Sequence, residues 1–256
     1  MKNRSIAKKC RDYRKIVSAF VFVSLVLAII GIVIMMIIAP SKPQLDDPNG
    51  HLKSDYVLML VQCILGLIVI LLPGTIEKKI KIEIPSKVMV LYILFIYALT
   101  FLGEVRSFYY RVPHFDTILH TFSGAMIAAL GFSIIAFLNN SDRIPVTLSP
   151  LFVACFTFCF ALALGSIWEI YEFLADEILN TNMQKFALEN GVQLIGRQAV
   201  TDTMKDLIVD AIGALVISLI GYISLKYEKG WIEKNQIKRA KKAYQNLEDS
   251  LTKEVS

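Results

Sequence analysis

Long runs of residues without charge constrain the fold of this chain more than any other feature. Runs free of Asp, Glu, Lys and Arg cover 16–41, 56–76, 88–103, 117–141, 144–168 and 211–225. A membrane-spanning helix needs about 20 mostly apolar residues, so four runs suffice as they stand, and 88–103 and 211–225 must extend into flanking charged residues. With 55% hydrophobic residues overall, the sequence predicts an all-α membrane bundle of about six transmembrane helices.

The first run follows a basic leader, residues 1–15, as the apolar part of a signal peptide would. It is longer than the usual apolar region of about 7–15 residues and no Ala-x-Ala site ends it, so we interpret it as a retained anchor. The rest of the chain divides into two N-terminal helices with their connectors (16–84), a four-helix core (85–226) and a charged tail (227–256).

The placement of basic residues predicts the orientation in the membrane. Of the 27 Lys and Arg residues, 20 fall on the side of a six-span arrangement that holds both termini, and seven on the other. Basic residues near span ends stay in the cytoplasm, so both termini are expected to be cytoplasmic. The net charge of +5 then reflects topology and contact with anionic membrane lipid, and no nucleic-acid partner is needed to explain it.

Several local signals predict where helices begin and end. Pro73-Gly74 should end the second helix, and the alternation in 76–84 favours a short strand or an amphipathic strip after it. Asp116 and Asp202 are expected to cap the N-termini of their helices. A short amphipathic helix is expected around Met183 to Glu189.

Three polar stretches lie at the expected external ends of spans. They are DTILH (116–120), GSIWEIYEFLAD (165–176) and DTMKDLIVD (202–210), and in each the acids or the histidine recur three or four residues apart. Each helix would therefore carry them on one face. Counted from the cytoplasmic ends at about 1.5 Å per residue, His120 and Glu169 reach roughly 30 Å and Asp210 about 24 Å. The sequence thus predicts one shallow, outward-facing polar pocket with Asp210 near its floor.

Small residues continue the same helical stripes below these polar groups. Because small residues let transmembrane helices pack closely, they would bring the polar ends together. They are Ser123, Gly124, Ala128, Gly131, Ala161, Gly165, Gly213 and Ala214.

A different physical argument applies to the position of each acid. Glu169 and Glu172 are expected at a helix C-terminus, where the helix dipole disfavours negative charge, so they need another role. Asp206 and Asp210 lie within a span, where an acid is a functional candidate by default. His120, beside Asp116 on one face, is a candidate ligand or proton carrier.

So many carboxylates near hydrocarbon require neutralisation by divalent cations, shared protons or nearby basic residues. Oxygen-rich ligands with one imidazole suit Mg²⁺, Mn²⁺ or Zn²⁺. The candidate metal ligands are Asp116, His120, Glu169, Glu172, Asp206 and Asp210, and the candidate catalytic groups are His120, Glu169, Glu172 and Asp210. Arg197 and Lys205 are candidate contacts for an anionic substrate.

The three polar stretches, taken together, resemble a known family. DTILHTFSG, GSIWEIYEF and the DTMKDLIVDAIGA that begins at Asp202 are similar to the YjdF-like integral membrane proteins of bacteria, over roughly residues 85–226. The arrangement is also distantly similar to VanZ-type membrane proteins. The resemblance implies a multi-pass protein of a bacterial cell membrane and implies no particular activity.

Three functions are compatible with the proposed pocket. In the first, a metal activates water against a phosphate or ester of a lipid-linked substrate at the outer leaflet. In the second, the carboxylates serve an ion- or proton-coupled transporter, although neither comparable charges in the cytoplasmic halves of these spans nor an inverted repeat supports it. In the third, a non-catalytic envelope protein binds lipid or a protein partner through the pocket.

Overall fold

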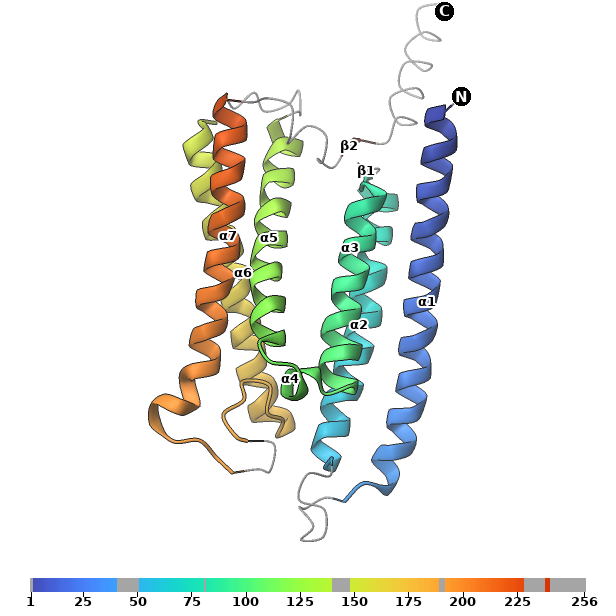
Figure 1. The fold of residues 1–256 in the computed structure, drawn as a ribbon, viewed down its shortest axis with the longest axis vertical. Helices are drawn as coiled ribbons and strands as arrows, with labels where there is room; N and C mark the ends of the chain where they lie inside the picture. The colour runs from blue at the N-terminus through green and yellow to red at the C-terminus, as the bar shows by residue number, and fades with distance from the viewer. Residues whose placement is uncertain are drawn as a thin grey trace, which may run out of the picture.

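A computed structural model describes residues 2–40, 51–80, 82–139, 148–188, 192–227 and 238–239. Most of these residues are helical, which confirms the all-α prediction (Figure 1). The elements are α1 (Lys2–Ile38), α2 (Lys53–Ile80), β1 (Ile82–Glu83), α3 (Ser86–Tyr97), the π-helix η1 (Ala98–Val105), α4 (Phe108–Arg111), α5 (Phe115–Asn139), α6 (Pro150–Leu179), the 3-10 helix η2 (Gly196–Val200), α7 (Thr201–Tyr227) and β2 (Lys238–Arg239).

Six helical segments are long and apolar enough to cross a membrane, which confirms the predicted number of spans. They are Tyr13–Ile38, Lys53–Lys79, Ser86–Val105, Phe115–Ala136, Pro150–Leu179 and Gly196–Tyr227. Helix is the expected form because hydrocarbon offers backbone N–H and C=O groups no other partner. The start of α1 and the end of α7 lie at the same end of the molecule (Figure 1), as six spans require. Which end faces the cytoplasm stays a prediction.

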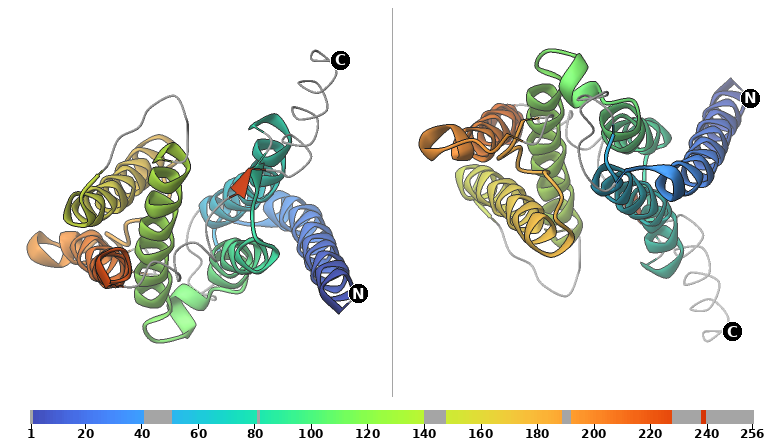
Figure 2. Two further views of the ribbon diagram at one scale, coloured as in Figure 1. Left: turned by 90° about the horizontal axis from the view of Figure 1, so that it is seen from above. Right: turned by 90° about the horizontal axis from the view of Figure 1, so that it is seen from below.

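The helices form two groups of three that lie side by side (Figure 2). In the first group, α1, α2 and α3 pack around Val21, Leu25, Cys63 and Ile93. In the second, α5, α6 and α7 pack around a core that includes Ala128, Ala161 and Ala214. The helix α3 packs mainly against α1 and α2, although it belongs to the 85–226 part of the sequence. The division of the chain into functional parts stays a prediction.

Glycines bring α5 and α7 into backbone contact. A Cβ atom on Gly124 would lie 2.2 Å from the carbonyl oxygen of Asp210, and one on Gly213 would lie 2.0 Å from that of Thr121. Neither position has room for a side chain. On α6, a Cβ atom on Gly165 would lie 2.8 Å from Oδ2 of Asp210. The expected close approach of these helices is confirmed.

The chain between α2 and α3 differs from the expectation. Pro73 lies inside α2, which continues to Ile80, so the predicted end of this helix at Pro73-Gly74 was wrong. Proline is tolerated in membrane helices because neighbouring groups replace the lost hydrogen bond. A strand does follow, but it covers only Ile82–Glu83, which pairs antiparallel with Lys238–Arg239.

Candidate functional site

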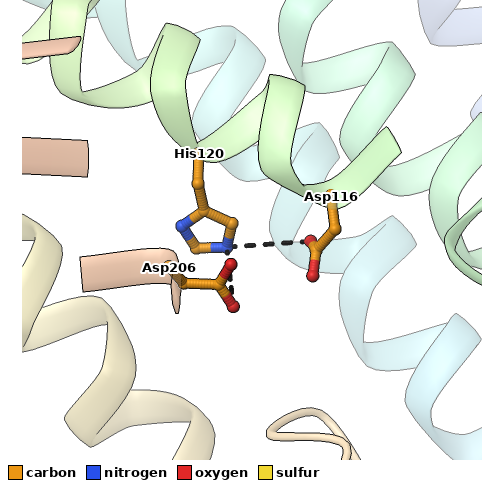
Figure 3. Close-up of side chains that lie close together, drawn as sticks. All are labelled: Asp116, His120 and Asp206. Carbon is orange, nitrogen blue, oxygen red and sulfur yellow. Dashed lines mark ion pairs between the residues drawn. The ribbon is translucent and has the colours of Figure 1, made fainter. Parts of the chain in front are cut away.

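His120 joins the polar ends of α5 and α7. Its Nε2 lies 3.8 Å from Oδ1 of Asp116, one turn earlier on α5, and 3.8 Å from Oδ2 of Asp206 on α7 (Figure 3). One ligand atom from each of the three residues lies within 4.8 Å of the other two. Atoms that bind one ion at about 2.1 Å lie roughly 3.0–4.2 Å apart. Small side-chain movements therefore suffice for the three residues to hold a metal ion.

Asp210 lies on the other side of the His120 ring. Its Oδ2 is 3.4 Å from Nδ1 of His120, and its Oδ1 accepts a hydrogen bond of 2.6 Å from the Ser123 hydroxyl. Metal-binding histidines usually donate their second ring N–H to such a carboxylate, which sets the orientation of the ring. This position suits a residue that orients His120. The predicted roles of Asp210 as a ligand and catalytic group stay predictions.

Glu169 and Glu172 are both buried on α6, at 5% and 8% exposure. The helix continues to Leu179, so the expected position of both residues at its C-terminus, against the helix dipole, was wrong. The Trp168 indole N–H donates to Oε1 of Glu172 at 2.9 Å. Their assignment as metal ligands or catalytic groups stays a prediction.

The carboxylate of Glu169 is an unusual group in this site. Both of its oxygens are buried and neither has a hydrogen-bond partner in the described part of the chain, although Thr203 lies nearby. Burying a carboxylate without a partner is costly unless a proton or a cation neutralises it. Glu169 therefore requires a proton or a cation to neutralise it.

Lys185, which no sequence pattern marks as a site residue, reaches the same site from the loop after α6. Its Nζ donates to Oδ2 of Asp116 and lies 3.3 Å from Oδ2 of Asp202. It also lies 5.0 Å from the centre of the Tyr109 ring. Burial lowers the pKa of Lys185, but Asp116 and Asp202 together raise the pKa by more, so it lies above its ordinary value. Lys185 is therefore charged at neutral pH.

Asp176 holds the loop that carries Lys185. The Asp176 carboxylate accepts hydrogen bonds from the Thr181 hydroxyl at 2.7 Å, from the Met183 amide at 2.7 Å and from the Gln184 amide at 2.9 Å. Lys185 follows with a φ of 48°, a left-handed conformation that is uncommon for residues other than glycine. Asp176 thus fixes the backbone from which Lys185 turns into the site.

Three local expectations about these segments were wrong. Of the helix expected from Met183 to Glu189, residues 183–188 are not helical, and Glu189 lies outside the described residues. Ala187 instead forms an isolated bridge with Gln193. Asp116 lies inside α5, which begins at Phe115, and Asp202 lies inside α7, which follows directly on η2. Both aspartates face Lys185 from the first turn of a helix, so a tertiary contact takes the place of the expected caps.

A cavity of about 230 Å³ lies beside His120, between the two groups of helices. Its polar lining includes Glu104, Tyr109, Asp116, His120, Glu172, Lys185, Asp206 and Asp210. Glu104 and Tyr109 were also missed by the sequence analysis. Glu104 belongs to η1, and such wide helical turns are frequent at functional sites. The Tyr109 ring packs so closely on Gly103 that a Cβ atom there would lie 2.4 Å from its Cε2.

Arg197 and Lys205, the candidate contacts for an anionic substrate, are exposed and are not among the residues that line the cavity. Their proposed role stays a prediction. Of the three basic residues in 177–206, Lys185 is the one that turns inward, and spacing in the sequence contains no signal that distinguishes it.

Comparison with known proteins supports the membrane assignment. A protein of Thermotoga maritima, described as an uncharacterized protein, is 27% identical over 153 residues, which cover 59% of this chain and 69% of that protein. No solved structure matches the chain. A family model described as "Predicted membrane protein (DUF2238)" matches residues 21–227. Since this match spans most of the sequence and all six candidate spans overlap it, the chain belongs to the DUF2238 family of multi-pass membrane proteins.

Proposed function

We propose that this protein is a divalent-metal-dependent hydrolase or transferase that acts on a lipid-linked substrate at the outer leaflet of a bacterial cell membrane. The observation that carries the proposal is the group formed by Asp116, His120 and Asp206, whose ligand atoms lie within 4.8 Å of one another. Two carboxylates and one imidazole suit Mg²⁺, Mn²⁺ or Zn²⁺.

The surroundings of this group also fit a cation. Asp206 is 4% exposed and accepts no hydrogen bond from any other described residue, and Glu169 is buried without a partner. A divalent ion adds the positive charge that these carboxylates lack. In catalysis such an ion polarises an ester or phosphoester oxygen and makes water more acidic.

The other residues then take distinct roles in the proposed reaction. Asp210 orients His120 through Nδ1, and Ser123 in turn fixes Asp210. Glu172 lines the cavity and is the candidate general base. Lys185 faces the same space and neutralises Asp116.

The helix packing below the site favours chemistry at one membrane surface over transport. Deeper than Asp210, α5, α6 and α7 meet through Ala128, Ala161 and Ala214. Beyond these alanines, the hydroxyls of Thr157 and Ser218 lie 3.3 Å apart. A transport pathway needs polar groups along the full span, whereas here tightly packed small residues close the floor of the site.

A metal titration of the purified, chelator-treated protein tests the proposal. We expect saturable binding of Mn²⁺ or Zn²⁺ that Asp116→Asn, His120→Gln and Asp206→Asn each weaken, while the exposed acid Glu177, changed to Gln, leaves it unchanged. We also expect metal-dependent turnover in a screen of membrane lipids, lost in His120→Gln. The metal proposal fails if the unsubstituted protein binds no divalent ion, or if none of the three ligand variants weakens binding. Binding without turnover of any lipid would instead favour a non-catalytic lipid- or partner-binding protein.

A further inference from the structure

The cavity beside His120 has a polar end and an apolar end. The apolar part extends between the two groups of helices and is lined by Leu58, Leu65, Phe95, Ile96, Leu119 and Ile127. Phe95 and Ile96 lie about two turns before Glu104 in the third span, and Ile127 lies about two turns after His120 in the fourth, so the apolar lining extends deeper into the spans than these polar groups. A hydrocarbon chain fits such a lining, and its polar group would then lie at the carboxylate end.

The charges at the polar end select against an anionic group. Five carboxylates line the cavity, those of Glu104, Asp116, Glu172, Asp206 and Asp210, against two groups that can be positive, Lys185 and His120. Carboxylates thus outnumber the basic groups of this lining. An anion would be repelled from this end, whereas a cation would be attracted.

Two carboxylates of this lining remain available to a ligand. Glu172 uses Oε1 to accept the Trp168 N–H, and its Oε2 accepts no hydrogen bond from a described side chain. Glu104 forms no side-chain hydrogen bond or ion pair with the described residues.

The aromatic rings at this end suit an ammonium group. Tyr109 and Trp168 line the cavity beside Glu104 and Glu172. The Tyr109 ring already holds one ammonium group, that of Lys185, at 5.0 Å from its centre. Ammonium groups bind aromatic faces, most strongly where water is excluded.

We propose that the cavity binds a lipid whose polar end carries an ammonium group, held by Glu104, Glu172 and the rings of Tyr109 and Trp168. Its hydrocarbon chain lies along the apolar lining from α2, α3 and α5. This assignment rests on the proposed function, because it names the substrate class of the same site. It differs from an anionic lipid, which the exposed Arg197 and Lys205 would have suggested.

Binding of matched single-chain amphiphiles tests this assignment. The chain has two tryptophans, Trp168 and Trp231, so a Trp231→Phe background leaves Trp168 fluorescence as a reporter within the cavity. The metal-free protein, in a neutral maltoside detergent with a dodecyl chain, is titrated with dodecyltrimethylammonium and with dodecyl phosphate. We expect the Kd for the ammonium compound to be about tenfold lower than that for the phosphate.

Substitutions then locate the binding site. Glu172→Gln and Glu104→Gln should each raise the Kd for the ammonium probe roughly three- to tenfold, while Glu177→Gln, which changes an exposed acid on the same helix as Glu172, should not. Equal or tighter binding of the phosphate overturns the assignment, and this comparison requires no variant at the site to fold. Unchanged binding in both glutamine variants overturns it as well. A parallel metal titration separates this failure from failure of the metal site, since His120→Gln should weaken metal binding and leave binding of the ammonium probe unchanged.

Discussion

Nδ1 of His120 lies 3.4 Å from Oδ2 of Asp210, on the side of the ring opposite the two carboxylates that face Nε2. Asp210 is 2% exposed and is itself held by the hydroxyl of Ser123. The two ring nitrogens therefore have different surroundings, one suited to orientation and the other to coordination.

This relationship predicts the effect of removing the charge of Asp210. Asp210→Asn should lower divalent-metal affinity about 10- to 100-fold without changing the number of ions bound, because it disturbs a partner of the ligand. Ser123→Ala should have a smaller effect in the same direction. Calorimetric titration measures both. Loss of stoichiometric binding in Asp210→Asn would show instead that Asp210 is itself a ligand.

Backbone contact between α5 and α7 predicts a strong sensitivity to side-chain size at Gly213. Gly213→Ala places a Cβ atom 2.0 Å from the carbonyl oxygen of Thr121 and should destabilise the protein by about 1–3 kcal/mol through overpacking. The matched control is Gly31→Ala on α1, where no atom lies within 4 Å of the new Cβ. Thermal unfolding in detergent compares the two. If Gly213→Ala unfolds at the same Tm as Gly31→Ala, the close packing of α5 against α7 is contradicted.

The raised pKa of Lys185 predicts how its contribution to stability depends on pH. A group whose pKa is raised by folding stabilises the protein fully below its unfolded pKa, about 10.4 for lysine, and loses this effect as pH rises through the folded value. Lys185→Met should therefore lower Tm at about pH 8, and the difference from the unsubstituted protein should narrow above about pH 10.4. Lys205→Met, at an exposed position, is the control. A difference in Tm that stays constant up to about pH 11 would argue against the charge of Lys185 as its cause.

The hydrogen bonds of Asp176 predict that backbone amides in the loop after α6 are protected from hydrogen exchange. Asp176→Ala removes the acceptor of the Met183 and Gln184 amides, so hydrogen exchange at these two amides should become faster. Exchange in the core of α6 should change little. Glu177→Gln, the neighbouring exposed acid, should leave the loop protected. Unchanged exchange in Asp176→Ala would mean that other contacts hold the loop.

The expected orientation can be checked by thiol labelling in a variant without the four native cysteines. Arg197→Cys places an exposed thiol at the start of η2, and Lys226→Cys places one near the end of α7. The two thiols therefore lie at opposite ends of the sixth candidate span. A membrane-impermeant reagent should label position 197 in intact cells and position 226 only after permeabilisation. The reverse pattern would place the acidic cavity on the cytoplasmic side.

The sequence alone determined the membrane architecture of this protein. Apolar runs of span length can be stable in hydrocarbon only as helices, so composition and length suffice to predict six spans. Helical spacing also placed the acids of each polar stretch on one face, and small residues on the same stripes predicted the approach of α5, α6 and α7. These signals are local, since each depends on residues within a few turns of one helix.

Only the tertiary structure decided which groups complete the site. Lys185 lies 69 residues from Asp116 in the chain, and it reaches the site because the Asp176 carboxylate organises an irregular loop, which has no periodicity to read. Glu104 and Tyr109 join the cavity because the second group of helices packs beside the first. Helical periodicity shows which face of a helix is polar, but the partner of that face depends on packing between segments far apart in sequence.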